Sequence, residues 1–168
     1  MRHLCCLFVL GGAGLLAQNP LTDAVTARYQ PVRDNLIATA EAMPEDAYEF
    51  KLTPAQRSFA GWIGHVAMGN YHFFSLIKGE AAPENPALHS MTAKAALVKA
   101  VKDSFAYCDT ALQGMTDQKA LSPVTVNGKQ SYPVQSMVGL IASANEHYGN
   151  LVGYLRSKGI TPPSSTKH

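Results

Sequence analysis

Two histidines in separate predicted helices are the residues of this sequence best suited to chemistry. His65 lies on the same turns as Trp62, and His147 follows Leu140 and precedes Leu151 at helical spacing. An imidazole that points into an apolar interior needs a partner, because an unpaired buried polar group costs roughly 1–3 kcal/mol. A divalent metal ion shared by both rings would meet that need. A water molecule, a tyrosine hydroxyl or a backbone carbonyl would meet it too, and residue spacing alone favours this structural explanation.

The other histidines and Cys108 give weaker evidence for a reactive site. His72 follows His65 by seven residues, roughly 10 Å along a helix at 1.5 Å per residue, so we expect it at the edge of the fold and away from an ion at His65. His89 lies in a predicted loop. Cys108 shares a helical stripe with Phe105, which indicates a buried small hydrophobe and not a nucleophile. The sequence has no glycine-rich phosphate loop, no paired-cysteine metal motif and no Gly-x-Ser-x-Gly motif.

Four segments of helical periodicity must position these histidines. Apolar residues recur at intervals of three and four within residues 21–43, 58–78, 92–113 and 133–158. A long irregular connection separates the third and fourth helices, and its Asn127-Gly128 pair predicts a small hairpin over residues 124–129. The fold class is therefore an all-α four-helix bundle, whose helix order periodicity cannot decide.

Composition limits the partners. The chain has 168 residues, 46% of them hydrophobic, which suits one domain with an ordinary core. Charged residues make up only 15%, the formal net charge is +2, and the lysines are scattered along the chain. Nucleic-acid binding is not expected, because it requires lysine and arginine gathered on one face. A small-molecule substrate and a homodimer stay open as partners.

The first residues have the pattern of an export signal. Arg2 precedes an apolar segment over residues 4–16, and Ala17 offers a small residue for cleavage before Gln18. That segment is too short for a permanent transmembrane helix. We expect a signal peptide over residues 1–17, a bundle over 18–160 and a disordered tail over 161–168. The mature chain would then be periplasmic or secreted without stable membrane insertion; an uncleaved anchor is the alternative.

Three segments resemble one known family. Residues 43–48 (MPEDAY) are similar to the turn that closes the first helix of DinB-like proteins. Residues 57–66 (RSFAGWIGHV) resemble the entry to their second helix, and residues 146–152 (EHYGNLV), with the exit through Pro162 and Pro163, resemble their fourth helix and its end. The resemblance extends over nearly all of the expected mature chain.

The resemblance implies a four-helix bundle that holds a divalent metal ion, zinc or nickel, with three histidines. One ligand comes from the second helix and two from a His-x-x-x-His pair on the fourth. His65 matches the first ligand and His147 the last, but Ser143 occupies the middle position. Because a serine hydroxyl is a poor neutral ligand for such ions, we expect metal binding that is weaker and more exchangeable than in the full pattern.

Two classes of function follow from these expectations. The first is a divalent-metal-binding protein of unknown reaction, with two alternatives: a degenerate metal-dependent transferase that adds a thiol to an electrophile, or a hydrolase. The missing ligand and the expected export both argue against the thiol transferase. The alternative is a non-catalytic small-molecule-binding or structural bundle that has lost its metal. Its pocket would be lined by aromatic residues that more often fill a core: Trp62, Phe73, Phe74, Tyr148 and Tyr154.

Overall fold

Residues with strong backbone preferences set the ends of the helices. Ser58 is the N-cap of α2 (Phe59–Lys78), and its side chain accepts a hydrogen bond from the Gly61 N–H at 3.1 Å. Gly79 ends that helix in the left-handed region at φ 72°. Pro133 begins α5 at the first helical position, where its missing N–H is of no consequence.

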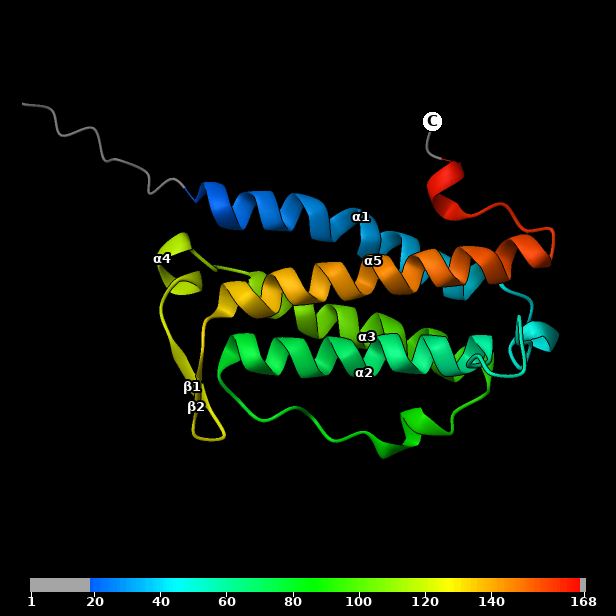
Figure 1. Cartoon of the computed structure of the whole chain (residues 1–168), viewed down its shortest axis with the longest axis horizontal. Coiled ribbons are helices and arrows are strands. Elements are labelled where there is room, and N and C mark those ends of the chain that lie inside the picture. Colours follow the sequence, from blue (N-terminus) through cyan, green and yellow to red (C-terminus); the bar gives the residue numbers. More distant parts are fainter. Residues whose placement is uncertain (1–18, 167–168) are drawn as a thin grey trace, which may run out of the picture.

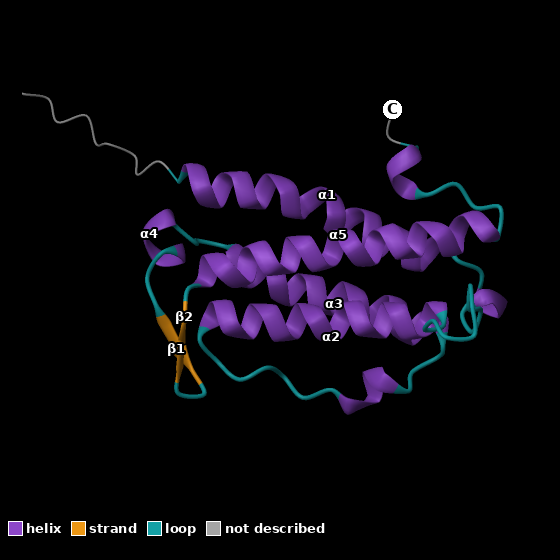
Figure 2. Ribbon diagram, viewed as in Figure 1, coloured by secondary structure: helices purple, strands orange, loops and turns teal. Residues whose placement is uncertain are grey.

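The computed structural model describes residues 19–166, which fold mainly into four long helices (Figures 1 and 2). Their bounds are α1 (Pro20–Ala42), α2 (Phe59–Lys78), α3 (Lys94–Leu112) and α5 (Pro133–Ser157). This confirms the all-α bundle, and each expected helix lies within a few residues of its predicted range. Helix α1 continues through Pro31 without interruption.

The helix order, which periodicity could not decide, involves a crossover. Helix α2 packs between α3 and α5, and α1 packs between the same two helices on the opposite side. In Figure 1, α1 and α5 run in one direction while α2 and α3 run in the other. Because α2 and α3 are parallel, the connection over residues 79–93 travels the length of the bundle, with a 3₁₀ helix η2 (Pro86–His89) that packs on α2.

The connection between α3 and α5 is more regular than expected. It contains a short helix, α4 (Asp117–Ala120), and a hairpin of β1 (Val124–Val126) and β2 (Lys129–Ser131). The strands are antiparallel, with Val124 opposite Ser131. Asn127 and Gly128 have φ angles of 51° and 75°, as a type I′ turn requires, so the predicted hairpin is present.

Helix α4 completes the start of α1. The Asp117 carboxylate accepts hydrogen bonds from the Leu21 N–H at 3.0 Å and the Thr22 N–H at 2.8 Å. These N–H groups belong to the first turn of α1, where the helix itself provides no acceptor. The side chain of the N-cap residue, Asn19, does not accept from them. Asp117, 95 residues after Thr22, therefore caps the helix as an N-cap side chain normally does.

The core runs through the middle of the four helices. Its fully buried side chains include Tyr29, Leu36, Phe59, Phe74, Leu97, Phe105, Leu151 and Tyr154. Cys108 is completely buried in the same core, as predicted. Among residues 19–166, no helix is both long and apolar enough to cross a membrane.

The described C-terminal end of the chain differs from the expectation. Residues 161–166 are folded, with a 3₁₀ helix η3 (Pro163–Ser165), and the Tyr148 hydroxyl lies 2.8 Å from Ser164 Oγ and accepts the Ser164 N–H at 2.9 Å. This corrects the expectation of a disordered tail for these six residues, because a tyrosine of α5 supplies polar partners for the chain. The expected signal peptide over residues 1–17 lies outside the described residues.

A further 3₁₀ helix, η1 (Glu45–Ala47), follows α1 and turns the chain toward α2. The Tyr48 hydroxyl at its end donates to the Ala40 carbonyl at 2.5 Å, which fixes the turn against the last part of α1. Backbone hydrogen bonds then join this turn to the entry of α2, from the Phe59 N–H to the Phe50 carbonyl at 2.9 Å and from the Ala60 N–H to the Tyr48 carbonyl at 2.8 Å. The start of the helix that carries His65 is held in place by these contacts.

Candidate functional site

Helices α2 and α5 bring the two predicted histidines together. The rings of His65 and His147 have centroids 4.9 Å apart and planes inclined at 57°. Both residues are half-buried, so neither ring is turned fully to solvent. Ser143 lies one turn before His147 on α5, and its Oγ is 3.0 Å from Nε2 of that ring. The structure therefore gathers all three positions that the sequence singled out.

Trp62 forms a wall beside both imidazoles. Its ring centroid is 5.3 Å from that of His147 and 6.0 Å from that of His65. The indole Nε1–H donates to the Tyr154 hydroxyl at 3.2 Å, and that hydroxyl donates to the Arg57 carbonyl at 2.5 Å. This relay from α5 to the start of α2 fixes the orientation of the indole. Sequence reasoning treated Trp62 and Tyr154 only as apolar residues and did not find the relay.

A positive charge stands at the edge of the pair. The exposed Arg57 side chain stacks on Trp62, with its guanidinium carbon 5.1 Å from the ring centroid. Burial lowers the pKa of His65 below its ordinary value, and the charge of Arg57 lowers it further. Burial also lowers the pKa of His147, as do His65 and Arg57, against an opposing effect of Glu146. Both rings are therefore held in the neutral form that can ligate a metal ion.

The cavity beside His147 is small. A cavity of about 10 Å³ lies between α2 and α5, with Ser143 and His147 in its wall. A single water molecule needs roughly 10–15 Å³, so no substrate fits inside. The Nδ1 atom of His147 is buried and has no hydrogen-bond partner among the described residues. Trp62 and Tyr154, two of the aromatic residues nearby, are buried in the core.

The distances in the pair suit a shared ion. With metal–nitrogen bonds of about 2.0–2.1 Å, two imidazoles on one tetrahedral ion have centroids roughly 5 Å apart, and neighbouring donor atoms lie roughly 3.3–3.4 Å apart. The two rings are 4.9 Å apart, whereas the 3.0 Å between His147 Nε2 and Ser143 Oγ is the distance of a hydrogen bond. Within residues 19–166, however, no three His, Cys, Asp or Glu side chains are grouped to hold a metal. The donors fit a weakly held ion and do not fit the three-histidine site that the resemblance implies.

The remaining described histidines lie elsewhere. His72 is exposed on α2, two turns beyond His65, and His89 is exposed at the end of η2. Neither joins the pair as a third ligand, which agrees with the expectation that His72 lies at the edge of the bundle. Both residues line a separate hollow on the outer face of α2.

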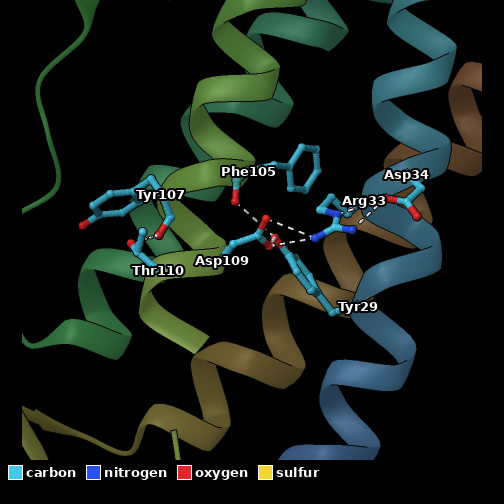
Figure 3. A network of polar contacts seen from close by, with 7 residues as sticks. All are labelled: Tyr29, Arg33, Asp34, Phe105, Tyr107, Asp109 and Thr110. Carbon is cyan, nitrogen blue, oxygen red and sulfur yellow. Dashed lines mark hydrogen bonds and ion pairs between the residues drawn. The ribbon is translucent and has the colours of Figure 1, made fainter. Parts of the chain in front are cut away.

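A second polar cluster joins α1 to α3 and was not foreseen from the sequence (Figure 3). Asp109 accepts a hydrogen bond from the Tyr29 hydroxyl at 2.9 Å and two from Arg33 Nη1 at 3.0 and 3.1 Å. The other two guanidinium nitrogens of Arg33 contact Asp34 at 2.9 Å. Every nitrogen of the guanidinium thus has a carboxylate partner, and the cluster ties the two helices together.

The comparisons with known proteins agree with the arrangement of the helices. A DinB-like protein from Bacillus cereus has a TM-score of 0.72 at 14% sequence identity, over 84% of this chain and 95% of that one. A DinB-like protein from Bacillus subtilis has a TM-score of 0.65 at 17% identity, over 82% and 94%. A protein from Enterococcus faecalis also has a TM-score of 0.65, at 14% identity over 83% and 97%. Identities this low show a shared fold and nothing of function.

The sequence itself carries the family assignment. No curated protein matches the chain. Residues 28–149 match the DinB superfamily, a segment that extends from the middle of α1 to the last third of α5 and includes His65, Ser143 and His147. Because this match covers well over half of the chain and the solved structures share its fold, the chain belongs to the DinB superfamily.

Proposed function

We propose that this chain is an exported DinB-like protein that binds a divalent metal ion, zinc or nickel, weakly and reversibly between His65 and His147. The observation that supports the proposal is the 4.9 Å separation of the two rings, which is the spacing of two imidazoles on one ion. The lowered pKa of each ring adds support, because a metal binds neutral imidazole. Export is part of the proposal on the pattern of residues 1–17 alone.

Two imidazoles leave several coordination positions for water or an outside ligand. A bound ion of this kind would lower the pKa of a coordinated water or thiol and so supply a nucleophile at neutral pH. Burial and the charge of Arg57 would favour the neutral form of the two rings. Tyr154 would fix Trp62 beside them, and Arg57 would lie at the edge of the site. Since the cavity beside His147 is only about 10 Å³, a substrate would have to approach from the solvent side.

A second candidate function is a helical bundle that has lost its metal. The bond between Ser143 and His147 favours it, because the hydroxyl already satisfies the ring nitrogen that would otherwise face an ion. The two candidates differ in the role of His65. In a metal site His65 is a ligand, whereas in a metal-free bundle it is a half-buried ring that packs against Trp62.

Metal titration of protein purified without a histidine tag separates the candidates. We expect one zinc or nickel ion per chain, bound weakly enough for a moderate chelator to remove it. His65→Ala and His147→Ala should each abolish measurable binding, since one imidazole and a hydroxyl are too few strong donors. His72→Ala is the matched control, because it removes an exposed histidine from the same helix as His65 and should leave the affinity unchanged.

Two results would count against the metal proposal. One is the absence of stoichiometric zinc or nickel binding by the wild type, at protein concentrations where the wild type and the His72→Ala control are both folded and soluble. The other is binding that survives both His65→Ala and His147→Ala, which would place the ion elsewhere on the chain. Either result would favour the metal-free bundle.

A further inference from the structure

A hollow of about 310 Å³ lies on the outer face of α2, away from the core. Helix α2 contributes Met68, Tyr71 and His72 to its wall, and the crossover connection contributes residues 82–86, 88 and 89. Figure 1 shows this connection running alongside α2 for the length of the helix. The volume is near the lower end of the roughly 300–1,000 Å³ of small-molecule pockets, so it suits a compound with a single ring.

Contacts at both ends of the crossover connection hold the hollow open. At one end, a Cβ atom on Gly64 would lie only 2.5 Å from the Leu88 carbonyl oxygen, so glycine alone permits this close approach of the connection to α2. The Leu88 side chain is buried, with 2% of its surface exposed. At the other end, Glu80 accepts a hydrogen bond from the Tyr107 hydroxyl at 2.6 Å and pairs with Lys78 at 2.7 Å. The connection is therefore anchored on either side of the hollow.

The lining has a definite chemical character. Its walls are mainly apolar, and Tyr71 offers a ring that is itself packed on Tyr107 at a centroid distance of 5.3 Å. Glu84 is the only Asp, Glu, Lys or Arg among the lining residues. It makes no ion pair with any of the described side chains. A hollow lined by both an aromatic ring and a carboxylate without an ion-pair partner is a suitable environment for an organic cation.

We propose that this hollow binds a small organic cation with a flat apolar body, such as a protonated primary arylalkyl amine. The ammonium group would pair with Glu84, and the apolar body would lie against Met68 and Tyr71. The imidazoles of His72 and His89 would supply further hydrogen-bonding atoms at the edge.

The hollow is also close to the histidine pair. Met68 and His72 follow His65 at intervals of three and seven residues, so the three side chains share one face of α2. The hollow thus begins about one helical turn beyond His65. The proposed cation site does not depend on a metal at His65 and His147, and it can be tested with a chelator present.

The test is a titration of ¹⁵N-labelled full-length protein with benzylammonium chloride, followed by NMR in the presence of a chelator. Binding should shift the amide signals of Met68, Tyr71, His72 and the non-proline residues of 82–89, and benzyl alcohol at the same concentrations should shift them much less. Glu84→Gln should weaken benzylammonium binding roughly twofold to fivefold, the range for an exposed charge pair. Glu49→Gln removes the same charge from an exposed position outside the hollow and should leave the affinity unchanged.

Several outcomes would overturn the proposal. No binding, or shifts centred on other residues, would remove the site. Equal binding of benzyl alcohol, or equal affinity in Glu84→Gln and the wild type, would show that the hollow does not select a cation. Glu84 is exposed, so a change in the thermal unfolding midpoint of Glu84→Gln is not expected, and its spectrum should otherwise match that of the wild type.

Discussion

Ser143 Oγ lies 3.0 Å from Nε2 of His147, in the position that a second histidine of α5 would occupy in a three-histidine site. The hydroxyl gives Nε2 a hydrogen-bond partner where a metal ion would otherwise bind, and the other ring nitrogen, Nδ1, is buried without a partner among the described residues. This chain has a weak donor where the resemblance implies a strong one, and His147 still lies beside His65.

Replacing that hydroxyl should strengthen metal binding. In Ser143→His a third imidazole would join His65 and His147, because residues four apart on a helix project from the same face on successive turns. We expect zinc or nickel affinity to rise by at least roughly tenfold to hundredfold. That is the change in affinity typical of a group that only supports a ligand, and a direct ligand should contribute no less. Isothermal titration of the tag-free proteins measures the change.

Asn145→His is the matched control for this prediction. It adds a histidine to the same helix at an exposed position, away from the pair. If Ser143→His binds metal no more tightly than Asn145→His, the three positions do not converge on one ion. The same conclusion would follow if the gain in Ser143→His survived the removal of His65.

Removing the charge at the edge of the site should make both histidines easier to protonate. Arg57 lowers the pKa of His65 and of His147, second to burial for the former. In Arg57→Gln both pKa values should therefore rise, while burial keeps them below the ordinary value of 6.5. A pH titration of the imidazole signals by NMR checks the direction, with Lys51→Gln as a variant of equal charge change. Unchanged or lower values in Arg57→Gln would show that the guanidinium does not act on the pair.

The same lowered pKa values predict an acid-sensitive fold. A histidine whose pKa is lower in the folded than in the unfolded chain binds protons more weakly when folded. Its contribution to stability is fully present above the unfolded value, near 6.5, and is lost as the pH falls from there toward the folded pKa. The free energy of unfolding by urea, with a chelator present, should therefore decrease between pH 7.5 and 5.5. The double variant His65→Gln/His147→Gln should show a smaller decrease, and His72→Gln/His89→Gln serves as the control pair.

The relay that fixes Trp62 should be worth more than an ordinary surface hydrogen bond. Tyr154→Phe removes the hydroxyl that accepts from the indole and donates to the Arg57 carbonyl, and it leaves the indole N–H buried without a partner. We expect a loss of about 1–3 kcal/mol in the free energy of unfolding. Tyr148→Phe, on the same helix, removes a half-buried hydroxyl that contacts Ser164 and should cost less. Equal losses would contradict a special role for the relay.

The sequence predicted the helices well because the signals for them are local. Ser58, Gly79 and Pro133 mark helix ends through their own backbone preferences, and Asn127-Gly128 marks the hairpin turn in the same way. The parallel arrangement of α2 and α3 could not be predicted, since either order of helices buries the same apolar stripes. A contact that accompanies this arrangement, the close approach of Leu88 to Gly64, joins residues of α2 and of the crossover connection, and no local spacing rule relates them.

In the candidate site, too, local features could be predicted and contacts between distant residues could not. The facing of His65 and His147 and the place of Ser143 could be predicted, because helical spacing and resemblance to a family specify which side of each helix points inward. The relay from Trp62 to Tyr154 and the pairing of Arg33 with Asp109 could not. These contacts join polar atoms across 76 or more residues of sequence, and no spacing rule relates them.

The contact between α4 and the start of α1 leads to a prediction about stability. In Asp117→Ala the N–H groups of Leu21 and Thr22 lose the carboxylate that accepts from them. We expect the thermal unfolding midpoint to fall by a few degrees, as for the loss of a helix cap. Asp23→Ala removes an acidic residue of the first turn of α1 and is the control. An unchanged midpoint in Asp117→Ala would mean that water replaces the carboxylate without cost.

The long-range cap also bears on the order in which the chain can fold as it is made. Thr22 is synthesised 95 residues before Asp117, so the first turn of α1 has to wait for most of the bundle before its N–H groups are covered. The first turn of α1 is thus among the last parts of the chain to gain its hydrogen-bond acceptors, although α1 is the first helix in the sequence. A nascent chain that stops before α4 would carry α1 with a frayed start, and only a chain extended past that helix can close the molecule at this end.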